Sequence, residues 1–463
     1  MLRAREKRES KDTVNMTSGN IAGHMVSFAF PIFLSQLFQQ LYNTADTLIV
    51  GKFLGTEALA AVSSSGTLIF LLTSFFIGTS MGAGVLISQL FGAGDHNGVS
   101  RAIHTNVALG LISGVFLTVI GVFFTPIFLR WMNTDESVMP QAVEYFRYYF
   151  WGVITVVMYN VLKGIMNAVG DSRRPLYYLI FSSLLNIGLD LLFIGIFRWD
   201  VWAAAFATVL SQLASCILCL THLLKKGQIY SIEIGKIRIH KEMLLATIKY
   251  GVPSGIQNSV IGLANVVVQS QINSFGAAAM AAYGAHSKIE GFAFLPITSF
   301  NMATTTFISQ NLGAKEYERA KKGAAFGIAA AMILSELIGV ICYMAAPSLM
   351  AMFDSTPEVI GLGVQQARTE ALFFFLLAFA HSVASVCRGA GKAVVPMIIM
   401  LSIWCVLRIA YIAFVMAVFH EIRYIYWAYP LTWAISCVIY LLYYIKSDWV
   451  HGFEKKSKHI LFG

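Results

Sequence analysis

The sequence predicts an all-α integral membrane protein with twelve transmembrane helices, arranged in two similar six-helix lobes. Composition, the spacing of apolar segments and an internal repeat carry this prediction. Of the 463 residues, 57% are hydrophobic and only 12% are charged, and the mean hydropathy is +0.68. About a quarter of the residues of a soluble globular domain are charged. This composition therefore places the chain in a lipid bilayer.

Twelve apolar segments reach the length of about 20 residues that crosses a bilayer. They lie at 26–50, 58–82, 102–126, 142–166, 175–197 and 201–224, and then at 246–272, 279–304, 323–346, 366–388, 394–418 and 424–446. Between the sixth and seventh, a stretch of alternating Ile and charged residues forms a linker. The expected parts are a tail (1–24), a first lobe (25–224), the linker (225–244), a second lobe (245–446) and a tail (447–463).

Short motifs and Gly and Pro positions of the first half recur in the second half. The tripeptide Ile-Ser-Gln at 87–89 recurs 221 residues later at 308–310, and Gly170 and Pro175 map in the same way onto Gly391 and Pro396. Pro31 lands on Pro253 at an offset of 222, which implies one slipped residue in the first helix. Such repeats underlie transporters in which two bundles open a cavity to either side in turn. The pattern predicts a transporter.

The distribution of basic residues predicts the topology. With both termini inside, 23 of the 33 Lys and Arg residues fall on inner segments, and four lie outside: Lys52, Arg130, Arg198 and Arg423. Cytoplasmic loops carry such an excess of positive charge. The apolar run after the polar first 22 residues is too long for a cleaved signal peptide. We expect a multi-pass protein of the cytoplasmic membrane with N and C termini inside.

Several other classes of function are excluded. The net charge of +9 is spread over short loops, which argues against nucleic-acid binding. Cys216 and Cys219 have a CxxC spacing but no further ligands nearby, so helix packing explains them better than metal binding. A membrane acyl or glycosyl transferase requires His-x4-Asp or paired-carboxylate motifs at a membrane face, and none is evident. We expect no enzyme activity, no cofactor and no firm metal site.

Ionisable side chains inside a membrane are costly and mark functional sites. At about 1.5 Å per residue, Asp46 and Asp190 lie roughly 6 and 10 Å from the outer ends of the first and fifth helices. Asn186 lies one turn before Asp190, and Thr208 reaches a similar level on the sixth helix. These four side chains form a candidate site for a proton or a sodium ion. The alternative is that Asp46 caps a helix end and Asp190 makes a structural hydrogen bond.

The second lobe lacks these acids, because Asp190 maps onto Tyr411 and Asp46 onto Val267 or Val268. The coupling site is therefore expected in the first lobe alone. Other membrane charges have a structural alternative: Lys288 lies within one turn of Glu290 and can neutralise it, and Arg408 or a cationic substrate can pair with Glu336. We retain Glu290, Glu336 and Arg408 as candidates for cavity lining, and interpret His286 and His381 as core histidines.

The whole chain resembles the multidrug and toxic compound extrusion (MATE) family. The matching features are Pro31 in a first helix that ends Ala45-Asp46-Thr47, the Ile-Ser-Gln stretches, and the Gly170…Pro175 and Gly391…Pro396 turns. The Asn186-x-x-x-Asp190 pattern is similar to the DinF-like branch. That resemblance implies ion coupling at Asp46, Asn186, Asp190 and Thr208, a supporting network of Tyr42 and Tyr145, and a helix bend at Pro31. The NorM-like branch carries acids in the seventh and tenth helices, where 255–268 and 373–385 have none.

We therefore expect a monomeric multidrug efflux antiporter that exports amphipathic, often cationic, organic compounds in exchange for inward H⁺ or Na⁺. The alternative is a flippase for lipid-linked saccharide precursors, a relative of MATE proteins with extra helices and a basic cavity. A few membrane cations keep this alternative open: Arg147, Lys163, Lys249, Arg368 and Arg408. Neither the substrate nor the choice between the two ions follows from the sequence.

Overall fold

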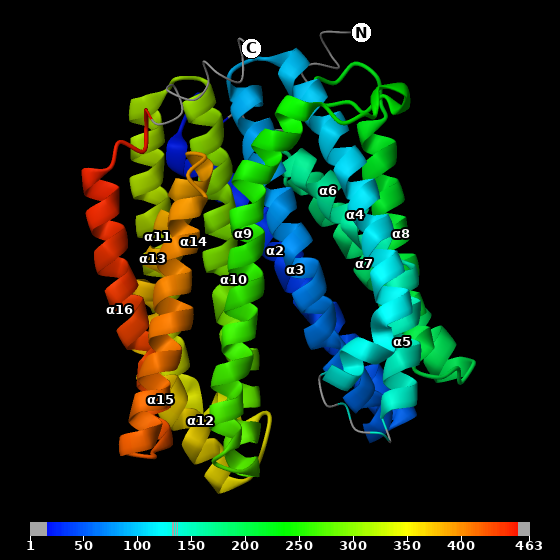
Figure 1. Cartoon of the computed structure of the whole chain (residues 1–463), viewed down its shortest axis with the longest axis vertical. Helices are drawn as coiled ribbons and strands as arrows, with labels where there is room; N and C mark the ends of the chain where they lie inside the picture. The colour runs from blue at the N-terminus through cyan, green and yellow to red at the C-terminus, as the bar shows by residue number, and fades with distance from the viewer. Residues whose placement is uncertain (1–15, 132–133, 135, 137, 452–463) are drawn as a thin grey trace. The chain divides into compact units, whose positions relative to one another are not determined.

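The computed structural model describes residues 16–131, 134, 136 and 138–451, and every regular element in these ranges is helical (Figure 1). The first half contains α2 (Ile21–Leu54), α3 (Thr56–Gly92), α4 (His96–Trp131), α5 (Met139–Trp151), α6 (Val153–Ala168), α7 (Arg173–Asp190), the π-helix η1 (Leu191–Ile196) and α8 (Trp202–Leu223). The linker contains the short 3₁₀ helix η2 (Ile234–Lys236).

The second half contains α9 (Lys241–Asn273), α10 (Ala277–Gly313), α11 (Tyr317–Ala351), α12 (Pro357–Glu370), the 3₁₀ helix η3 (Ala371–Phe373) and α13 (Phe374–Gly389). It ends with α14 (Val394–Met400), the π-helix η4 (Leu401–Leu407), α15 (Arg408–Val418) and α16 (Ile422–Lys446). Some helical segments follow one another without an intervening loop, and we count such a series as one rod. The described chain then contains twelve rods, six in each half.

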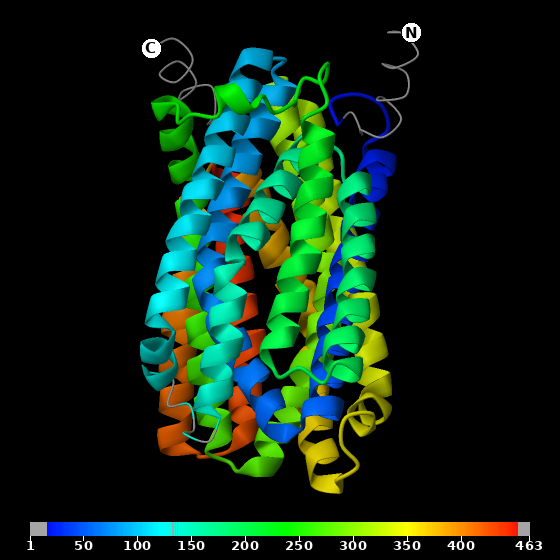
Figure 2. The same ribbon diagram turned by 90° about the vertical axis from the view of Figure 1, so that its right-hand side faces the viewer.

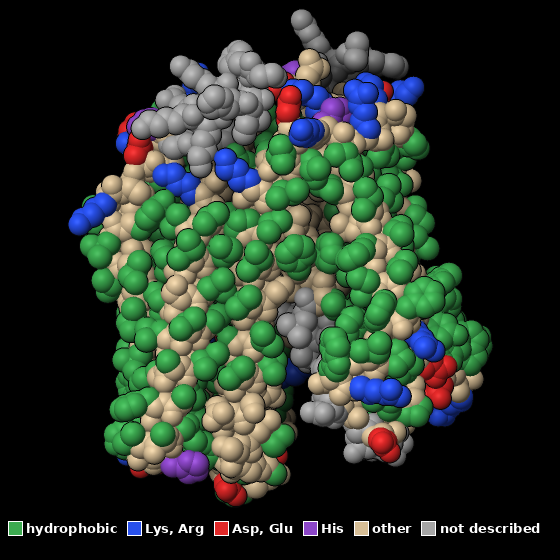
Figure 3. Space-filling model, viewed as in Figure 1, with side chains coloured by type: hydrophobic (Ala, Val, Ile, Leu, Met, Phe, Trp, Pro, Cys, Tyr) green, Lys and Arg blue, Asp and Glu red, His purple; other side chains and the backbone are tan. Residues whose placement is uncertain are grey.

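Nine spans in the described ranges are long and apolar enough to cross a membrane, and α5 and α6, bent by 47°, together form a tenth. The remaining two rods, α9 and α10, are long helices of 33 and 37 residues that carry more polar side chains. On the face drawn in Figure 3, hydrophobic side chains cover the sides of the helices, and Lys and Arg lie towards their ends. Phe123, for example, is 73% exposed, as expected of a surface in contact with lipid.

The described chain divides into two compact units, and the divisions fall inside helices. Unit 1 runs from Leu34 to Gly255, and unit 2 combines Met16–Phe33 with the chain from Ile256 onward. Each division comes three residues after a repeated proline, Pro31 or Pro253. The first helix of each repeat therefore contributes its opening turns to one unit and its remainder to the other, whereas the expected lobes kept each helix whole.

Close backbone packing explains why the start of α9 belongs to unit 1. Gly78 and Gly82 of α3 face Gly251 and Gly255 of α9, and a Cβ atom added at any of the four would lie within 3 Å of the opposite backbone. Glycines four residues apart let membrane helices approach this closely. The helices of unit 1 otherwise pack around α6, which contacts α3, α4 and α8.

The start of α2 belongs to unit 2 for a similar reason. Met16 is completely buried, and its carbonyl accepts a hydrogen bond from the Asn311 side chain (3.0 Å). Farther along, the Met25 methyl lies against Gly327 of α11. The core of unit 2 is formed by α10, α11 and α13, which all contact one another.

Candidate functional site

Asp46 and Asp190 come together inside unit 1. Asp46 lies in the second half of α2 and Asp190 is the last residue of α7, and their exposed fractions are 8% and 0%. The two carboxyl groups are close enough to interact electrostatically. Two acids from separate helices thus share one buried environment.

Apart from the contact between the two carboxyl groups, several polar atoms of the pair and of Asn186 have no hydrogen-bond partner among the described residues. They are one carboxyl oxygen of Asp46, both of Asp190, and the amide oxygen and nitrogen of Asn186, which is 1% exposed. Buried polar groups in proteins are nearly always paired, so each exception requires an explanation. Carboxylate and amide oxygens are hard ligands suited to a small hard cation, and a carboxylate can also take up a proton. The residues present therefore fit either ion.

Two tyrosines surround the pair. Tyr42, one turn before Asp46 on α2, accepts a hydrogen bond from the Gln212 side chain of α8 (3.4 Å). Tyr145 of α5 is buried and interacts electrostatically with both acids. Tyr145 also belongs to a cluster of buried apolar residues that includes Phe193, Ile194 and the alanines at 203–205 and 207. The acids therefore lie beside phenol rings, one of which packs into an apolar cluster.

The backbone changes geometry at the site. The π-helix η1 begins directly after Asp190. π-Helical turns are rare and often occur at functional sites, because they displace side chains from the regular α-helical register. The rod that carries both Asn186 and Asp190 is thus interrupted just beyond its acid.

The other expected site residues lie on the same elements. Thr208 is half-buried on α8, and its carbonyl accepts a hydrogen bond from the Ser211 hydroxyl (2.8 Å). Within the described ranges, no hydrogen bond joins the Thr208 side chain to either acid. Pro31 lies inside α2, before the division between the units. A proline inside a helix removes one backbone hydrogen bond, which makes this a place where α2 can bend.

Unit 2 holds a second charged cluster, formed by His286 and Glu290 of α10 and Glu370 of α12. One potential ligand atom from each residue lies within 4.8 Å of the others. Glu370 is fully buried; one carboxyl oxygen lies 3.2 Å from His286 Nε2 and the other accepts a hydrogen bond from the Gln366 amide at 3.1 Å. Its carboxylate is therefore satisfied by neighbouring side chains, unlike that of Asp190.

Arg408 adds a positive charge to this cluster. Its guanidinium donates two hydrogen bonds to the Thr432 hydroxyl (3.1 and 2.8 Å) and lies 4.5 Å from the centre of the Tyr429 ring. It also interacts electrostatically with Glu370 and Glu290. Arg408 directly follows the π-helix η4, so each unit places a charged residue next to a π-helical segment.

Glu336 has a different partner from the one considered in the sequence analysis. Its carboxylate accepts a hydrogen bond from the backbone N–H of Phe375 (3.2 Å), in the first turn of α13. The first N–H groups of a helix lack partners within the helix. Glu336 thus caps the break between η3 and α13, which suits a structural role.

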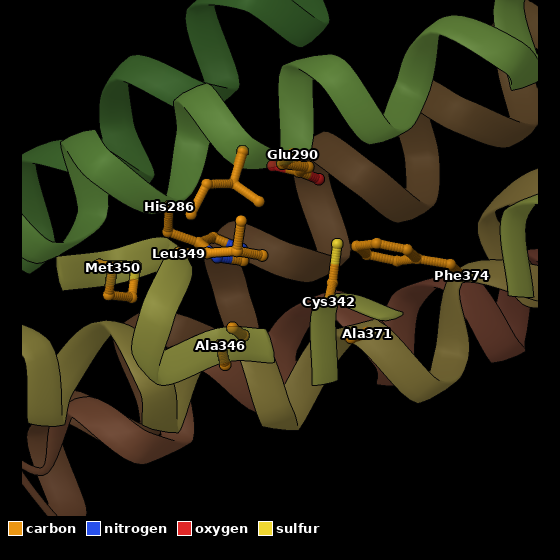
Figure 4. Close-up of a pocket in the computed structure, with 10 residues that line it drawn as sticks. His286, Glu290, Cys342, Ala346, Leu349, Met350, Ala371 and Phe374 are labelled. Carbon is orange, nitrogen blue, oxygen red and sulfur yellow. The ribbon is translucent and has the colours of Figure 1, made fainter. Parts of the chain in front are cut away.

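Figure 4 shows a cavity beside the second cluster, lined by His286, Glu290, Cys342 and Phe374 among others. About 10 Å³ is open to the centre of a water-sized sphere. This is close to the minimum that holds one water molecule. The cavity is too small for an organic compound.

Sequence reasoning missed Glu370. This acid falls within the apolar segment 366–388, and counting every acid inside a predicted span would have found it. The interpretation of His286 as a core histidine also missed its pairing with Glu370. His381, by contrast, lies with its ring against Phe294 and Trp404, at centroid distances of 5.0 and 5.1 Å.

A polytopic helical protein with a repeated six-rod architecture and a buried pair of acids belongs to the class of membrane transporters. The MatE family profile matches residues 31–192 and 253–414, one match in each repeat. These matches cover more than half of the chain, and the chain therefore belongs to the MatE (MATE) family. The two matched ranges begin at Pro31 and Pro253, which supports the offset of 222 there.

Known proteins of similar sequence and structure agree with this assignment. The chain is 29% identical over 432 residues to the probable multidrug resistance protein YoeA of Bacillus subtilis, covering 91% of this chain and 92% of that protein. It is 25% identical over 360 residues to an FAD transporter of Shewanella oneidensis, covering 76% and 78%. A MOP superfamily transporter from Pyrococcus furiosus has the same fold, with a TM-score of 0.87, 22% identity and coverage of 93% and 96%.

Three predictions are thereby confirmed. The fold class is an all-helical, two-lobe membrane protein of the twelve-helix MATE type. The family is MATE. The chain is a multi-pass membrane transporter rather than an enzyme.

Proposed function

We propose that this chain is an antiporter that exports amphipathic, often cationic, organic compounds while H⁺ or Na⁺ moves inward. Membership of the MATE family supports transport, and the relative YoeA is named as a probable multidrug resistance protein. We assign the chain to the DinF-like branch, because its buried acids without basic partners lie in unit 1. The topology has both termini in the cytoplasm, and the transporter acts as a monomer.

The single observation that carries the coupling site is the buried pair Asp46 and Asp190, with its unpartnered oxygens. Two carboxylates that share a buried site repel each other when both are ionised. A bound proton or sodium ion removes part of this repulsion. Ion binding therefore changes the charge of the site, and hence the packing that the site favours.

The ion binds at Asp46 and Asp190 when the site is open to the outside, with Asn186 as a further oxygen ligand. Neutralisation lets α2 repack near Pro31 and releases the substrate outward. At a membrane potential of 100 mV, one inward charge supplies about 2.3 kcal/mol. This energy drives about a fiftyfold concentration ratio for a neutral substrate.

The alternative function, flipping of lipid-linked precursors, requires free cations that hold phosphates in a cavity. Three of the membrane cations lie against tyrosine rings instead: Lys163 against Tyr159, Arg368 against Tyr343 and Arg408 against Tyr429, at 5.3, 5.4 and 4.5 Å from the ring centres. These contacts favour the antiporter over the flippase.

The test is drug efflux measured in inside-out membrane vesicles, driven in turn by a pH gradient and by a sodium gradient. We expect one gradient to drive uptake of a fluorescent organic cation, and Asp46→Asn to abolish that uptake at normal protein levels. An FAD-like anion belongs in the same panel, because one relative is named as an FAD transporter. Gradient-driven transport of wild-type size in Asp46→Asn would overturn the coupling assignment.

A further inference from the structure

The linker between the repeats folds back onto the start of α4 and forms a pocket with it in unit 1. Figures 1 and 2 show this green segment at one end of the helices. The pocket has a volume of about 390 Å³ and is lined from α4 by Asn97, Ser100, Arg101 and His104, and from the linker by Gly235, Lys236, Arg238 and His240. It lies far along the helices from the acid pair and is not part of the proposed coupling mechanism.

Buried side chains of α4 hold the linker in place. His104 is 1% exposed; its Nδ1 lies 2.7 Å from the Ser100 carbonyl and its Nε2 accepts a hydrogen bond from the backbone N–H of Glu233 (2.9 Å). Both ring nitrogens are therefore used. The hydroxyl of Thr105, also buried, accepts a hydrogen bond from the backbone N–H of His240 (3.1 Å). The pocket is built in advance of any ligand.

The pocket is rich in cations, and one of them has no acidic partner. Lys236 pairs with Glu233 at 2.8 Å, and Arg101 lies 3.5 Å from Glu242 with nearly half of each side chain exposed. Arg238 donates its Nε–H to His240 (3.1 Å), and no carboxylate among the described residues forms an ion pair with it. Its two terminal NH₂ groups remain available to a ligand.

The basic groups of the pocket act on His240. His240 lies outside the membrane-spanning helices, and its pKa is lowered, first by partial burial and then by the charges of Arg238 and Arg101. A guanidinium group matches a phosphate in two parallel hydrogen bonds, and Asn97 and Ser100 offer neutral donors beside it. This donor set selects an oxyanion over a cation or an apolar group.

Apolar residues flank the pocket. Ile234 is 71% exposed and Ile239 is 43% exposed, on either side of Lys236 and Arg238. Exposed apolar residues beside cations suit a position in the interfacial layer of a membrane, where apolar groups enter the headgroup region and cations attract anionic lipids. Clusters of Lys and Arg next to membrane helices on the cytoplasmic side attract anionic lipids.

We propose that this pocket binds a phosphate group, held by Arg101, Arg238 and Lys236, with an anionic phospholipid headgroup or a free organic phosphate as its source. The ligand bridges α4 and the linker, and so holds in place the part of the linker that leads into α9. This site is independent of the proposed antiport and of its ion.

The test measures binding of phosphatidylglycerol and of phosphatidylcholine to the purified full-length protein by native mass spectrometry. We expect phosphatidylglycerol to bind preferentially, and Arg101→Gln with Arg238→Gln to weaken that binding about tenfold or more, the size expected for losing a charge-assisted hydrogen bond. Lys321→Gln with Lys322→Gln is the matched control, because it removes two exposed cations from α11 in unit 2. Inorganic phosphate is added as a competitor.

The outcomes separate the two sources of phosphate. Competition by inorganic phosphate supports the site with a free organic phosphate as its ligand, and preferential lipid binding without such competition supports the lipid headgroup. Equal binding by wild type and the double variant, or an equal loss in the control variant, overturns the proposal. Arg238→Lys keeps the charge and is expected to bind with intermediate affinity, which provides a readout if the double variant melts at a lower temperature than wild type.

Discussion

Among the described helices, both units bury acidic side chains, but basic groups contact these acids only in unit 2. The buried Asp171 of unit 1, which pairs with Arg174, lies in the turn before α7. In unit 2, Glu370 contacts His286 and interacts with Arg408. In unit 1, the carboxyl oxygens of Asp190 have no hydrogen-bond partner within the described structure other than the Asp46 carboxyl group. A buried acid with a fixed base contributes to a structural network, whereas one without a base is available to a mobile ion.

The repeat allows this comparison to be made position by position. At the offset of 221, Asp190 corresponds to Tyr411 and Asn186 to Leu407, while Glu370 corresponds to Tyr149 and Glu290 to Ile69. Where one unit has an acid, the other has an aromatic or aliphatic side chain. The two units therefore share a backbone plan but have evolved separate polar sites, so one unit is an internal control for the other.

The largest effect is expected from Asp190→Asn, which removes the titratable group and keeps the size of the side chain. Gradient-driven efflux in inside-out vesicles should fall to the background of empty vesicles, at normal protein levels. The control is Tyr411→Phe at the equivalent position of unit 2, which should retain most of the transport. Equal losses in both variants would remove the functional distinction between the units.

Much of the fold and part of this site follow from the sequence. The apolar segments predict the rods, and the repeat predicts their pairing, because helix length and hydropathy are local properties. Asp46 and Asp190 follow from the cost of a charge in a membrane and from their similar depth on two helices. Depth is set by residue count along a helix, so it can be read without knowing how the helices pack.

The features that depend on packing could not be predicted in the same way. The division of α2 and α9 between the units rests on contacts such as Gly78 with Gly255, more than 170 residues apart. The grouping of Glu370 with His286 and Arg408 depends on how α10, α12 and α15 face one another. The spacing of apolar residues within one helix does not indicate which side chains of another helix it contacts.

The second-largest expected effect is a loss of stability in the variant Glu370→Gln. This change removes the carboxylate that His286 contacts and with which Arg408 interacts, and it leaves the buried guanidinium with less compensation. Breaking a buried pair of charges costs about 3 kcal/mol or more. The midpoint of thermal unfolding in detergent should fall by several degrees, whereas Asp190→Asn should leave it nearly unchanged.

A loss of ion coupling without a loss of stability in Glu370→Gln would contradict the proposed difference between the two units. If Glu370→Gln unfolded at the wild-type temperature and lost coupling, the cluster in unit 2 would be a site of ion coupling. A matched control is Glu318→Gln, which removes an exposed acid from an ion pair with Lys321. Surface pairs contribute little, so this variant should unfold like wild type.

A smaller effect concerns how the two units hold the chain that enters the first helix of each repeat. In unit 2, the guanidinium of Arg319 donates hydrogen bonds to the carbonyls of Met16, Ser18 and Gly19, at 3.0, 2.8 and 2.7 Å. In unit 1, His104 and Thr105 hold the linker through Glu233 and His240. Arginine stays charged at every accessible pH, but histidine does not.

The lowered pKa of His240 predicts a pH dependence confined to unit 1. The docked linker favours neutral His240, so this contribution is complete above the ordinary pKa of about 6.5 and is lost as the pH falls towards the lowered value. Hydrogen exchange at 234–240 should therefore rise modestly from about pH 7.5 to about pH 5.5, after correction for the intrinsic rate. Exchange at 16–19 should not change, and His240→Gln should abolish the response of the linker; an equal response at both places would contradict this assignment.

The smallest expected change is in residual efflux, when the second acid of unit 1 is mutated in addition to the first. Asp46 and Asp190 interact directly, and acids that share a site titrate as a unit. Removing either one already disables the ion site, so Asp46→Asn, Asp190→Asn and the double variant should have the same residual efflux. The measurement is the initial rate of gradient-driven uptake in vesicles with equal amounts of each protein. Independent sites would instead give losses that multiply, and in that case unit 1 would hold two separate acids rather than one site.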